Sequence, residues 1–288
     1  MKFKGSDYRV ERRHKDLFKE LGSCEKTDYS DQEIKEELIP PLVEKLQDLQ
    51  LKLHGEEKNG ILIVLQGMDA SGKDEIITFV FNHFLPQGLK ITPSKKPSEV
   101  EKKHDFLWRT YKGLPKRGEI AVFNRSYYED VLAFLVKNGE GAVPADGCRF
   151  EEEPWEERCE QINHFEKYLY QNGFSVLKIF PYVSKDVQKE RLLERMKNPK
   201  KNWEFSFSDI EDRKKWDLFH DSYQKIMKKT STTWAPWYVL PADNPWLTRL
   251  AAGQITLELL EEIKPEYPVI SGEDKDKRDR EIKKLEEE

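Results

Sequence analysis

Five short apolar runs, each bounded by turn or loop residues, constrain the fold of this chain most. They lie at 61–65, 89–92, 120–123, 176–180 and 237–240. The first, third and fourth are continuous rather than alternating, which is typical of strands buried on both faces of a sheet. Helical periodicity separates the runs, over 74–84, 99–112, 154–171, 185–196 and 245–263. Because strands that alternate with helices form parallel βαβ units, the pattern predicts a three-layer α/β fold around a central parallel five-stranded sheet.

A further helix is predicted over 30–53, before the first strand. Ser30 and Glu33 form a capping-box pattern, and leucines then recur at helical spacing. We therefore expect residues 1–55 to be an N-terminal helical extension and residues 56–265 to be the core. Residues 266–288 are almost wholly charged and should form a solvated tail that the chemistry does not need. The leucine-rich helix also suggests a homo-oligomer, either a dimer or a tetramer.

The composition limits the function classes. Lys and Arg number 49 against 54 Asp and Glu, a net charge of −5, which argues against a general nucleic-acid binder. No apolar run approaches the roughly 18 residues that span a bilayer, so no membrane association is expected. The three cysteines fit no metal or redox spacing, and the first twenty residues lack an apolar signal region. A cytoplasmic location is the expectation.

The segment 67–74 has the features of a phosphate-binding loop, since it follows the first predicted strand and opens a helix. Its residues are Gly67, Met68, Asp69, Ala70, Ser71, Gly72, Lys73 and Asp74. The glycines allow a tight turn whose N–H groups can point at phosphate oxygens, and Lys73 can reach the outer phosphates. Asp74 stands where Ser or Thr usually binds Mg²⁺. Asp69, inside the loop, is therefore a candidate metal ligand, because a carboxylate this close to phosphates requires a cation between them.

The third predicted strand leads directly into a second polar segment. Asn124 and Arg125 follow it, and Glu129 and Asp130 come slightly later. In phosphate-loop folds this strand end faces the loop, and a metal-binding carboxylate is expected there.

Three other places leave alternatives open. Lys95 and Lys96 follow the second strand and could hold acceptor phosphates, line a donor channel or form a surface turn. Arg109 could contact phosphate or form a buried ion pair. Asp243 could fix a turn, cap the last helix or bind the nucleotide base.

A cationic segment begins after the fourth strand, where nucleotide kinases carry a lid; we place this lid at about 184–215. Arg191 and Arg195 are four residues apart and share one helix face. Arginine binds phosphate through two parallel hydrogen bonds, which suits a lid over an anionic donor. Glu190 and Glu194 lie among these arginines, so a solvated helix with ion pairs is the alternative.

Beyond the phosphate loop, several blocks resemble the second polyphosphate kinase family. They are 67–74, 104–109, 123–131, 203–209 and 235–243, and in the family's order they cover roughly residues 8 to 265. The resemblance implies a P-loop kinase fold that uses inorganic polyphosphate and Mg²⁺, with Mn²⁺ as an alternative, to phosphorylate nucleotides, or runs in reverse. Asn124 accompanied by Glu129 is similar to the third subclass, which phosphorylates both AMP and ADP.

The same resemblance assigns roles to individual residues. It places the loop aspartate at Asp69, the loop lysine at Lys73 and a catalytic arginine at Arg125, and it implies that Arg191 and Arg195 grip the polyphosphate. It favours a functional role for the Lys95–Lys96 loop. The chain departs from the family after the lid arginines, where Glu204 replaces a frequent lysine and Phe207 a frequent proline.

Two other functions remain open from the residues alone. An ATP-dependent nucleotide or small-molecule kinase would suit the fold and the loop, although Asp74 counts against it. A non-catalytic P-loop scaffold is the second alternative, and it would tolerate loss of Lys73.

Overall fold

The computed structural model describes residues 4–11, 13–22, 27–94, 96–137 and 148–288. Its centre is a five-stranded sheet of order β2-β3-β1-β4-β5, in which all neighbouring strands are parallel. The strands are β1 Gly60–Leu65, β2 Leu89–Pro93, β3 Ile120–Asn124, β4 Phe174–Tyr182 and β5 Trp237–Pro241. All five predicted strands and the α/β class are therefore confirmed.

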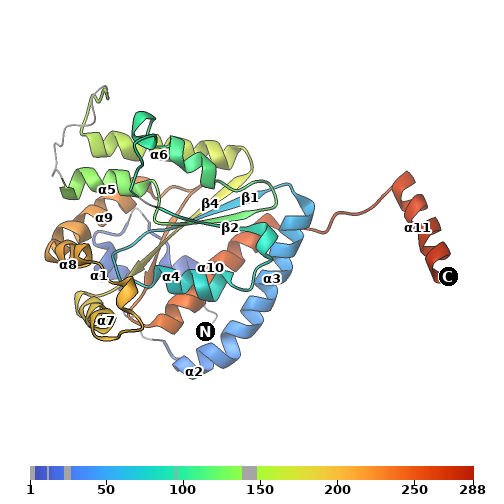
Figure 1. The fold of residues 1–288 in the computed structure, drawn as a ribbon, viewed down its shortest axis with the longest axis horizontal. Coiled ribbons are helices and arrows are strands. Elements are labelled where there is room, and N and C mark those ends of the chain that lie inside the picture. The colour runs from blue at the N-terminus through green and yellow to red at the C-terminus, as the bar shows by residue number, and fades with distance from the viewer. Residues whose placement is uncertain (1–3, 12, 23–26, 95, 138–147) are drawn as a thin grey trace.

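Helices cover both faces of the sheet (Figure 1). One layer contains α5 Tyr128–Lys137, α6 Pro154–Gln171 and α9 Trp216–Thr230; the other contains α3 Ile39–Glu56, α4 Lys73–Ile76 and α10 Pro245–Ile263. Side chains of β1 alternate between two hydrophobic clusters: Leu62 and Val64 pack with the first layer, and Ile61, Ile63 and Leu65 with the second. Every residue of β1 is buried, which explains its continuous apolar sequence.

The N-terminal helix forms as predicted. It begins with α2 Asp31–Glu33, continues through a π-helical stretch at Ile34–Leu38 and ends with α3. Ser30 and Glu33 make the expected reciprocal capping box. The helix predicted over 74–84 consists of α4 and a π-helical stretch at Ile77–Phe81. The helices predicted over 154–171, 185–196 and 245–263 are α6, α7 Lys185–Lys197 and α10.

The helix predicted over 99–112 is wrong. This segment contains two short 3₁₀ helices, Glu101–Lys103 and Trp108–Gly113. Ser98 and Glu101 exchange capping hydrogen bonds, but the backbone is extended again at His104. The Asp105 carboxylate then accepts a 3.0 Å hydrogen bond from the Leu107 amide. Such local bonds offer the backbone an alternative to a continuous helix.

The described N-terminal segment packs against the edge of the sheet, whereas the C-terminal helix stands apart. The N-terminal segment runs beside β5, where Val10 N donates a 2.8 Å hydrogen bond to Trp237 O and Arg9 forms a single bridge to Tyr238. At the other end, α11 Glu273–Glu286 stands apart from the body and buries no residue (Figure 1). The domain boundaries themselves stay a prediction.

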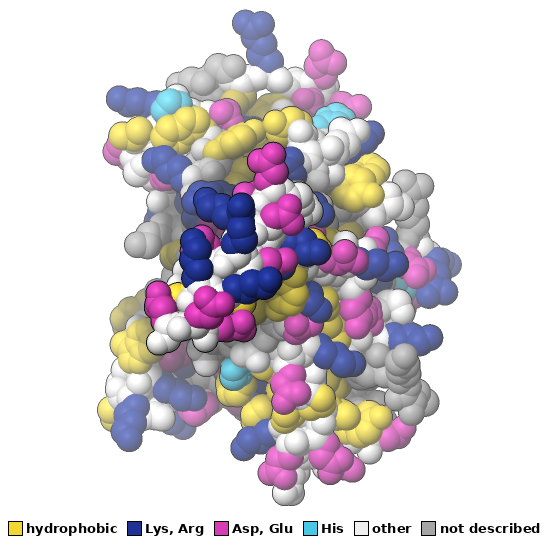
Figure 2. Space-filling model, turned by 90° about the vertical axis from the view of Figure 1, so that its right-hand side faces the viewer, with side chains coloured by type: hydrophobic (Ala, Val, Ile, Leu, Met, Phe, Trp, Pro, Cys, Tyr) yellow, Lys and Arg dark blue, Asp and Glu magenta, His cyan; other side chains and the backbone are white. Residues whose placement is uncertain are grey.

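The outer surface is strongly charged. On the face nearest α11, lysines, arginines and carboxylates of both signs are interspersed (Figure 2). Within the described ranges, no helix combines the length and the apolar character that crossing a bilayer requires.

Candidate functional site

The phosphate loop leaves the carboxyl end of β1 and leads into α4. Gly72 has φ 92° and Ala70 has φ 59°, so the loop twice enters the left-handed region. Glycine adopts that region without strain, whereas Ala70 is held there by its surroundings. A Cβ on Gly67 would lie 2.9 Å from Ser71 Oγ, so the turn has no room for a larger residue. The glycines therefore permit the tight turn, and contacts from outside the loop hold Ala70 in it.

Lys73 is buried inside the loop. Its ammonium donates 2.8 Å hydrogen bonds to the carbonyl oxygens of Gly67 and Met68, and Ser71 Oγ lies 3.4 Å away. Burial, followed by the nearby Arg125 charge, lowers the pKa of Lys73 to about 8. Among the described residues no carboxylate is in direct contact with this ammonium. An incoming phosphate can therefore replace its carbonyl partners.

Asp69 and Arg125 join the two polar segments. The Arg125 guanidinium forms an ion pair and hydrogen bond with Asp69 Oδ1. Arg125 has φ 62°, and its amide donates a 2.9 Å hydrogen bond to Leu65 O. A non-glycine residue in this region needs support from its surroundings, and such positions cluster at functional sites. Burial opposes the charge of Arg125, but the Asp69 and Glu129 carboxylates raise its pKa.

Glu129 is fixed by a residue that the sequence analysis did not single out. Gln66 is fully buried, donates a 2.5 Å hydrogen bond from Nε2 to Glu129 Oε1, and accepts one of 3.2 Å from Ser126 Oγ. Tyr223 of α9 lies 3.4 Å from the same Nε2. Gln66 directly precedes Gly67, but an amide there has no recognisable signature until Glu129 and Tyr223 are placed beside it.

Asn124 and Asp74 meet across the site. Asn124 Nδ2 donates a 2.6 Å hydrogen bond to Asp74 Oδ1. The residue that replaces the usual Ser or Thr is therefore in contact with the end of β3. The Ser94 amide donates to Asn124 O at 2.9 Å, which brings the loop after β2 to the same edge of the sheet.

Helix α7 contacts the phosphate loop directly. Arg191 Nη1 donates to Ala70 O at 3.0 Å and Arg191 Nη2 to Ala242 O at 2.5 Å. Gln188 Nε2 donates a 3.0 Å hydrogen bond to Asp69 O. Arg195 instead pairs with Glu204, at 3.3 Å between Nε and Oε2. The structure thus places Arg191 at the loop and ties Arg195 to the segment that follows α7.

Asp209 belongs to α8 Phe207–Lys214, the next helix of the predicted lid. It is buried, and burial followed by the charge of Asp69 raises its pKa. The lid therefore brings its own carboxylate close to Asp69, a second feature that the sequence analysis did not assign to the site.

The remaining candidates lie as follows. Lys95 falls outside the described residues, and Lys96 is exposed. Burial raises the pKa of Asp130 to about 6, and the charges of Arg109 and Arg158 oppose this shift. The cap of α10 is Asn244, whose Oδ1 accepts from the Trp246 and Leu247 amides. Capping by Asp243 was thus wrong by one position; its Oδ1 accepts a 2.8 Å hydrogen bond from Ser184 N, the N-cap of α7.

The donor set is of the kind that suits Mg²⁺ shared with phosphates. Among the described residues no group of three or more His, Cys, Asp or Glu is arranged to hold a metal. Mg²⁺ in phosphoryl-transfer sites commonly uses only one or two carboxylates, with substrate phosphates and waters as its other ligands. Asp69 and Glu129 can supply those two carboxylates.

Comparison with known proteins is consistent with this geometry. A sequence model described as polyphosphate kinase 2 matches residues 28–268. The chain belongs to the polyphosphate kinase 2 family. It is similar to the ADP-polyphosphate phosphotransferase of Rhodopseudomonas palustris, with 42% identity over 243 residues that cover 83% of this chain and 84% of the relative. It is also similar to the AMP/ADP-polyphosphate phosphotransferase of Meiothermus ruber, with 40% identity over 232 residues, 81% and 83% of the two chains.

A solved structure extends the family likeness to the whole fold. The crystal structure of polyphosphate kinase 2 from Arthrobacter aurescens TC1 superposes with a TM-score of 0.86 at 33% identity, covering 98% of both chains. The predicted P-loop kinase fold and the predicted family are confirmed, and the chain is a kinase.

Proposed function

We propose that this polyphosphate kinase 2 family member transfers a phosphoryl group between inorganic polyphosphate and a nucleotide, with AMP and ADP as acceptors. One observation carries the proposal: Asp69, Lys73 and Arg125 converge where β1 and β3 end, and α7 lies over the loop. Two of the similar proteins are named for ADP or for AMP and ADP as substrates. Asn124 accompanied by Glu129, on which the likeness to the AMP/ADP subclass rests, supports the same two acceptors.

Different residues have different roles in the phosphoryl transfer. An oxygen of the acceptor's terminal phosphate attacks the end phosphorus of the donor, and the bond to the bridging oxygen breaks, which leaves a polyphosphate shorter by one unit. Lys73 and Arg125 neutralise the charge that spreads over the transferring oxygens. Arg191, fixed between Ala70 O and Ala242 O, holds α7 over the loop. A lid in this place excludes water that would hydrolyse the donor.

Mg²⁺, or Mn²⁺ in its place, belongs to the proposal as a cofactor. Asp69 and Glu129 would hold it, and when bound it supplies further charge neutralisation. Gln66 orients the Glu129 carboxylate, and Arg125 orients that of Asp69. A cytoplasmic location and a homo-oligomeric state stay predictions.

A donor assay tests the function directly. Purified protein with long-chain polyphosphate, Mg²⁺ and either AMP or ADP should form ADP or ATP with no nucleoside triphosphate added. A second arm replaces polyphosphate by ATP and offers AMP and small-molecule acceptors. Product in the ATP arm alone would replace the proposal with an ATP-dependent kinase. Product with ADP but none with AMP would reject the dual acceptor range and leave the polyphosphate donor standing.

A further inference from the structure

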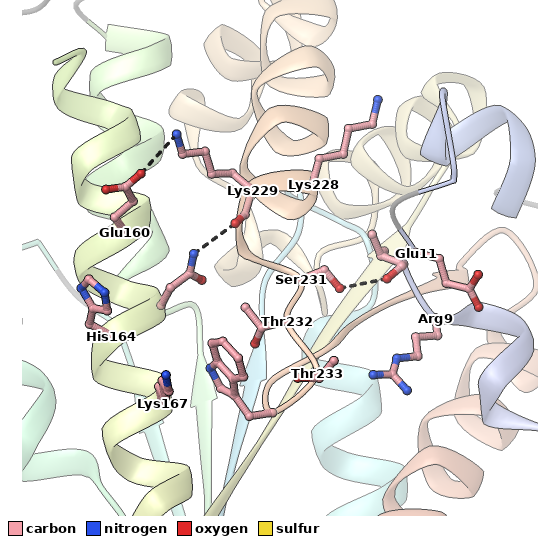
Figure 3. A pocket seen from close by; sticks show the side chains of 13 residues that line it. Arg9, Glu11, Glu160, His164, Lys167, Lys228, Lys229, Ser231, Thr232 and Thr233 are labelled. Atoms are coloured by element: carbon pink, nitrogen blue, oxygen red, sulfur yellow. Dashed lines mark hydrogen bonds and ion pairs between the residues drawn. The ribbon is translucent and has the colours of Figure 1, made fainter.

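A basic cavity lies at the end of the sheet opposite the phosphate loop. It has a volume of about 810 Å³ and lies where α6, the end of α9, the segment before β5 and the N-terminal segment meet (Figure 3). Strand β5 runs from this cavity toward the site and has five residues. At about 3.3 Å per residue the two places are therefore separated by at least roughly 16 Å. The cavity belongs to no part of the catalytic site described above.

The cavity carries an excess of positive charge. Four cations line it, Arg9, Lys167, Lys228 and Lys229, against two carboxylates, Glu11 and Glu160. Both carboxylates have a cationic partner: Glu160 lies 3.6 Å from Lys229 Nζ, which also pairs with Glu156 at 2.5 Å, and Glu11 lies 2.8 Å from the guanidinium of Arg13.

Three of the cavity's cations have no carboxylate partner. Over the described ranges no ion pair involves Arg9, Lys167 or Lys228. The side chain of Arg9 is directed toward Thr233, whereas that of Glu11 is directed away (Figure 3). Lys228 Nζ donates a hydrogen bond to Lys15 O, and Lys167 Nζ lies 5.3 Å from the centroid of the Trp234 ring. Three cations without a carboxylate partner, from three separate segments, therefore line one space.

Neutral polar groups complete the lining, and one of them, Asn163 Oδ1, is a buried acceptor with no donor among the described residues. Ser231, Thr232 and Thr233 bring hydroxyls, although Ser231 Oγ already donates to Val10 O at 2.9 Å. The indole N–H of Trp234 is buried and has no acceptor among the described residues.

The end of α9 does not cancel this positive character. A helix C-terminus normally carries partial negative charge on its free carbonyl groups. Here the last carbonyls are occupied: Thr230 O accepts from Lys178 Nζ at 2.7 Å, and Lys229 O accepts from Asn163 Nδ2 at 3.1 Å. The cavity is therefore arranged for an anion.

We propose that this cavity is a non-catalytic anchor for a distant stretch of the same polyphosphate chain whose end occupies the phosphate loop. The inference rests on the proposed function, because it takes polyphosphate as the substrate. A linear polymer of phosphates needs cations and donors along its length, which Arg9, Lys167 and Lys228 supply from three walls. Holding one part of the polymer raises the effective concentration of its end at the loop. A short donor that cannot span the two places gains nothing from the anchor.

The length of the polyphosphate donor separates an anchor from a catalytic role, because only a long donor can reach both the cavity and the phosphate loop. The triple variant R9A/K167A/K228A is compared with the unchanged protein on long-chain polyphosphate and on tripolyphosphate. The KM for the long chain should rise about tenfold, since each lost surface contact weakens binding modestly. The KM for tripolyphosphate and kcat on either donor should stay unchanged, and this short-donor activity also shows that the variant folds. A matched triple variant, K45A/K277A/K283A, removes the same charge from exposed positions on α3 and α11 and should leave both KM values unchanged.

Several outcomes would overturn the anchor. Equal KM shifts for the two donors would place the residues in the catalytic site, and the absence of any shift would show that the cavity holds no donor. An equal rise of the KM for long-chain polyphosphate in K45A/K277A/K283A would show that the effect comes from the protein's net charge and not from the cavity. A changed oligomeric state of R9A/K167A/K228A in light scattering would assign the cavity to a subunit contact, and loss of nucleotide binding alone would assign it to a nucleotide. Inactivity of the unchanged protein on both donors would instead reject the proposed function.

Discussion

Asn124 donates a 2.6 Å hydrogen bond from its side-chain amide to the carboxylate of Asp74, and this bond joins the end of β3 to the first turn after the phosphate loop. Asp74 stands where a hydroxyl is usual in such loops, so its carboxylate is held by an amide from another strand. Replacing that amide by a carboxylate would place two negative charges at hydrogen-bond distance. Because neighbouring carboxylates cannot both ionise freely, one pKa would rise.

The first prediction follows from this pair. Asn124→Asp should lower kcat/KM about tenfold near neutral pH, and part of the loss should be recovered as the pH falls and one carboxyl is protonated. The measurement is the pH profile of kcat/KM for ADP. The swapped double variant N124D/D74N restores one amide and one carboxylate and should regain most of the activity. If the double variant were no better than N124D, the contact between the two residues would not be the reason for the loss.

Lys73 gives the second prediction. Lys73→Ala removes a buried positive charge from the loop and should reduce kcat by a factor on the order of 10² to 10³, as loss of one transition-state donor does elsewhere. Lys90 is a suitable control, since its ammonium contacts Lys112 O on the surface away from the loop. Steady-state rates of K73A and K90A on polyphosphate and ADP test this, and unchanged turnover in K73A would refute the mechanism.

The lowered pKa of Lys73 makes activity and stability change in opposite directions with pH. Burial lowers the pKa from its ordinary value of 10.5 to about 8. As the pH rises through about 8 in the free enzyme, the ammonium loses its proton and kcat/KM for the donor should fall. Between about 8 and 10.5 the unfolded chain binds more protons than the folded one at this residue, so its contribution to the free energy of unfolding rises with pH.

Two measurements check this third prediction: the pH profile of kcat/KM and the urea midpoint over the same pH range. An arginine at position 73 stays charged over this whole pH range. In Lys73→Arg, neither kcat/KM nor the urea midpoint should therefore show the change with pH that Lys73 causes, whatever the absolute rate of the variant. An alkaline decline that persists unchanged in K73R would assign the titration to another group.

The sequence predicts those features of the site that neighbouring residues determine, and it does not predict those that depend on residues far apart in the chain. The loop is set by Gly67, Gly72 and Lys73 within a few residues, and their spacing is sufficient. Gln66 could not be found in this way, because its role depends on Glu129 and Tyr223, which are 63 and 157 positions away. The order of the strands likewise follows from long-range packing that no local pattern records.

Some features were present in the sequence and not recognised. Helix α9 buries Tyr223, Ile226, Met227 and Thr230 at the three- and four-residue spacing of an amphipathic helix. Conversely, the segment 99–112 has helical spacing without a continuous helix, because Asp105 bonds to the Leu107 amide locally. Local polar bonds thus override periodicity where few apolar residues are buried.

Glu204 gives the fourth prediction, since the structure shows which residue it restrains. Its carboxylate lies 3.3 Å from Arg195 Nε, and both side chains are partly exposed. Glu204→Lys should free Arg195 and add a cation, so the KM for polyphosphate should fall several-fold while the KM for ADP stays the same. Glu211→Lys on α8 is the matched control, because Glu211 pairs with exposed Lys214. An equal fall in E211K would attribute the gain to net charge rather than to Arg195.

The fifth prediction concerns the buried ion pair next to Tyr127 and Tyr128, in the polar segment that follows β3. Lys178 and Glu166 are completely buried, with 2.6 Å between Nζ and Oε2. Glu166 Oε1 also accepts hydrogen bonds from the hydroxyls of Tyr127, at 2.8 Å, and Tyr128, at 2.9 Å. Burial raises the pKa of Glu166 and lowers that of Lys178, while each partner favours the charged form of the other. The pair thereby holds the segment that begins with Arg125.

Glu166→Gln should therefore leave the Lys178 charge unpaired and lower the free energy of unfolding by about 3–5 kcal/mol, measured by urea denaturation. It should also reduce kcat, because the tyrosines that follow Arg125 lose their charged acceptor. Glu160→Gln, on the same helix but exposed, should change stability little. The double variant E166L/K178M removes both charges and should recover much of the stability, since apolar replacement of a buried pair is often tolerated. If E166Q were as stable as the unchanged protein, Lys178 would have to be neutral in the fold, and the pair would not be ionic.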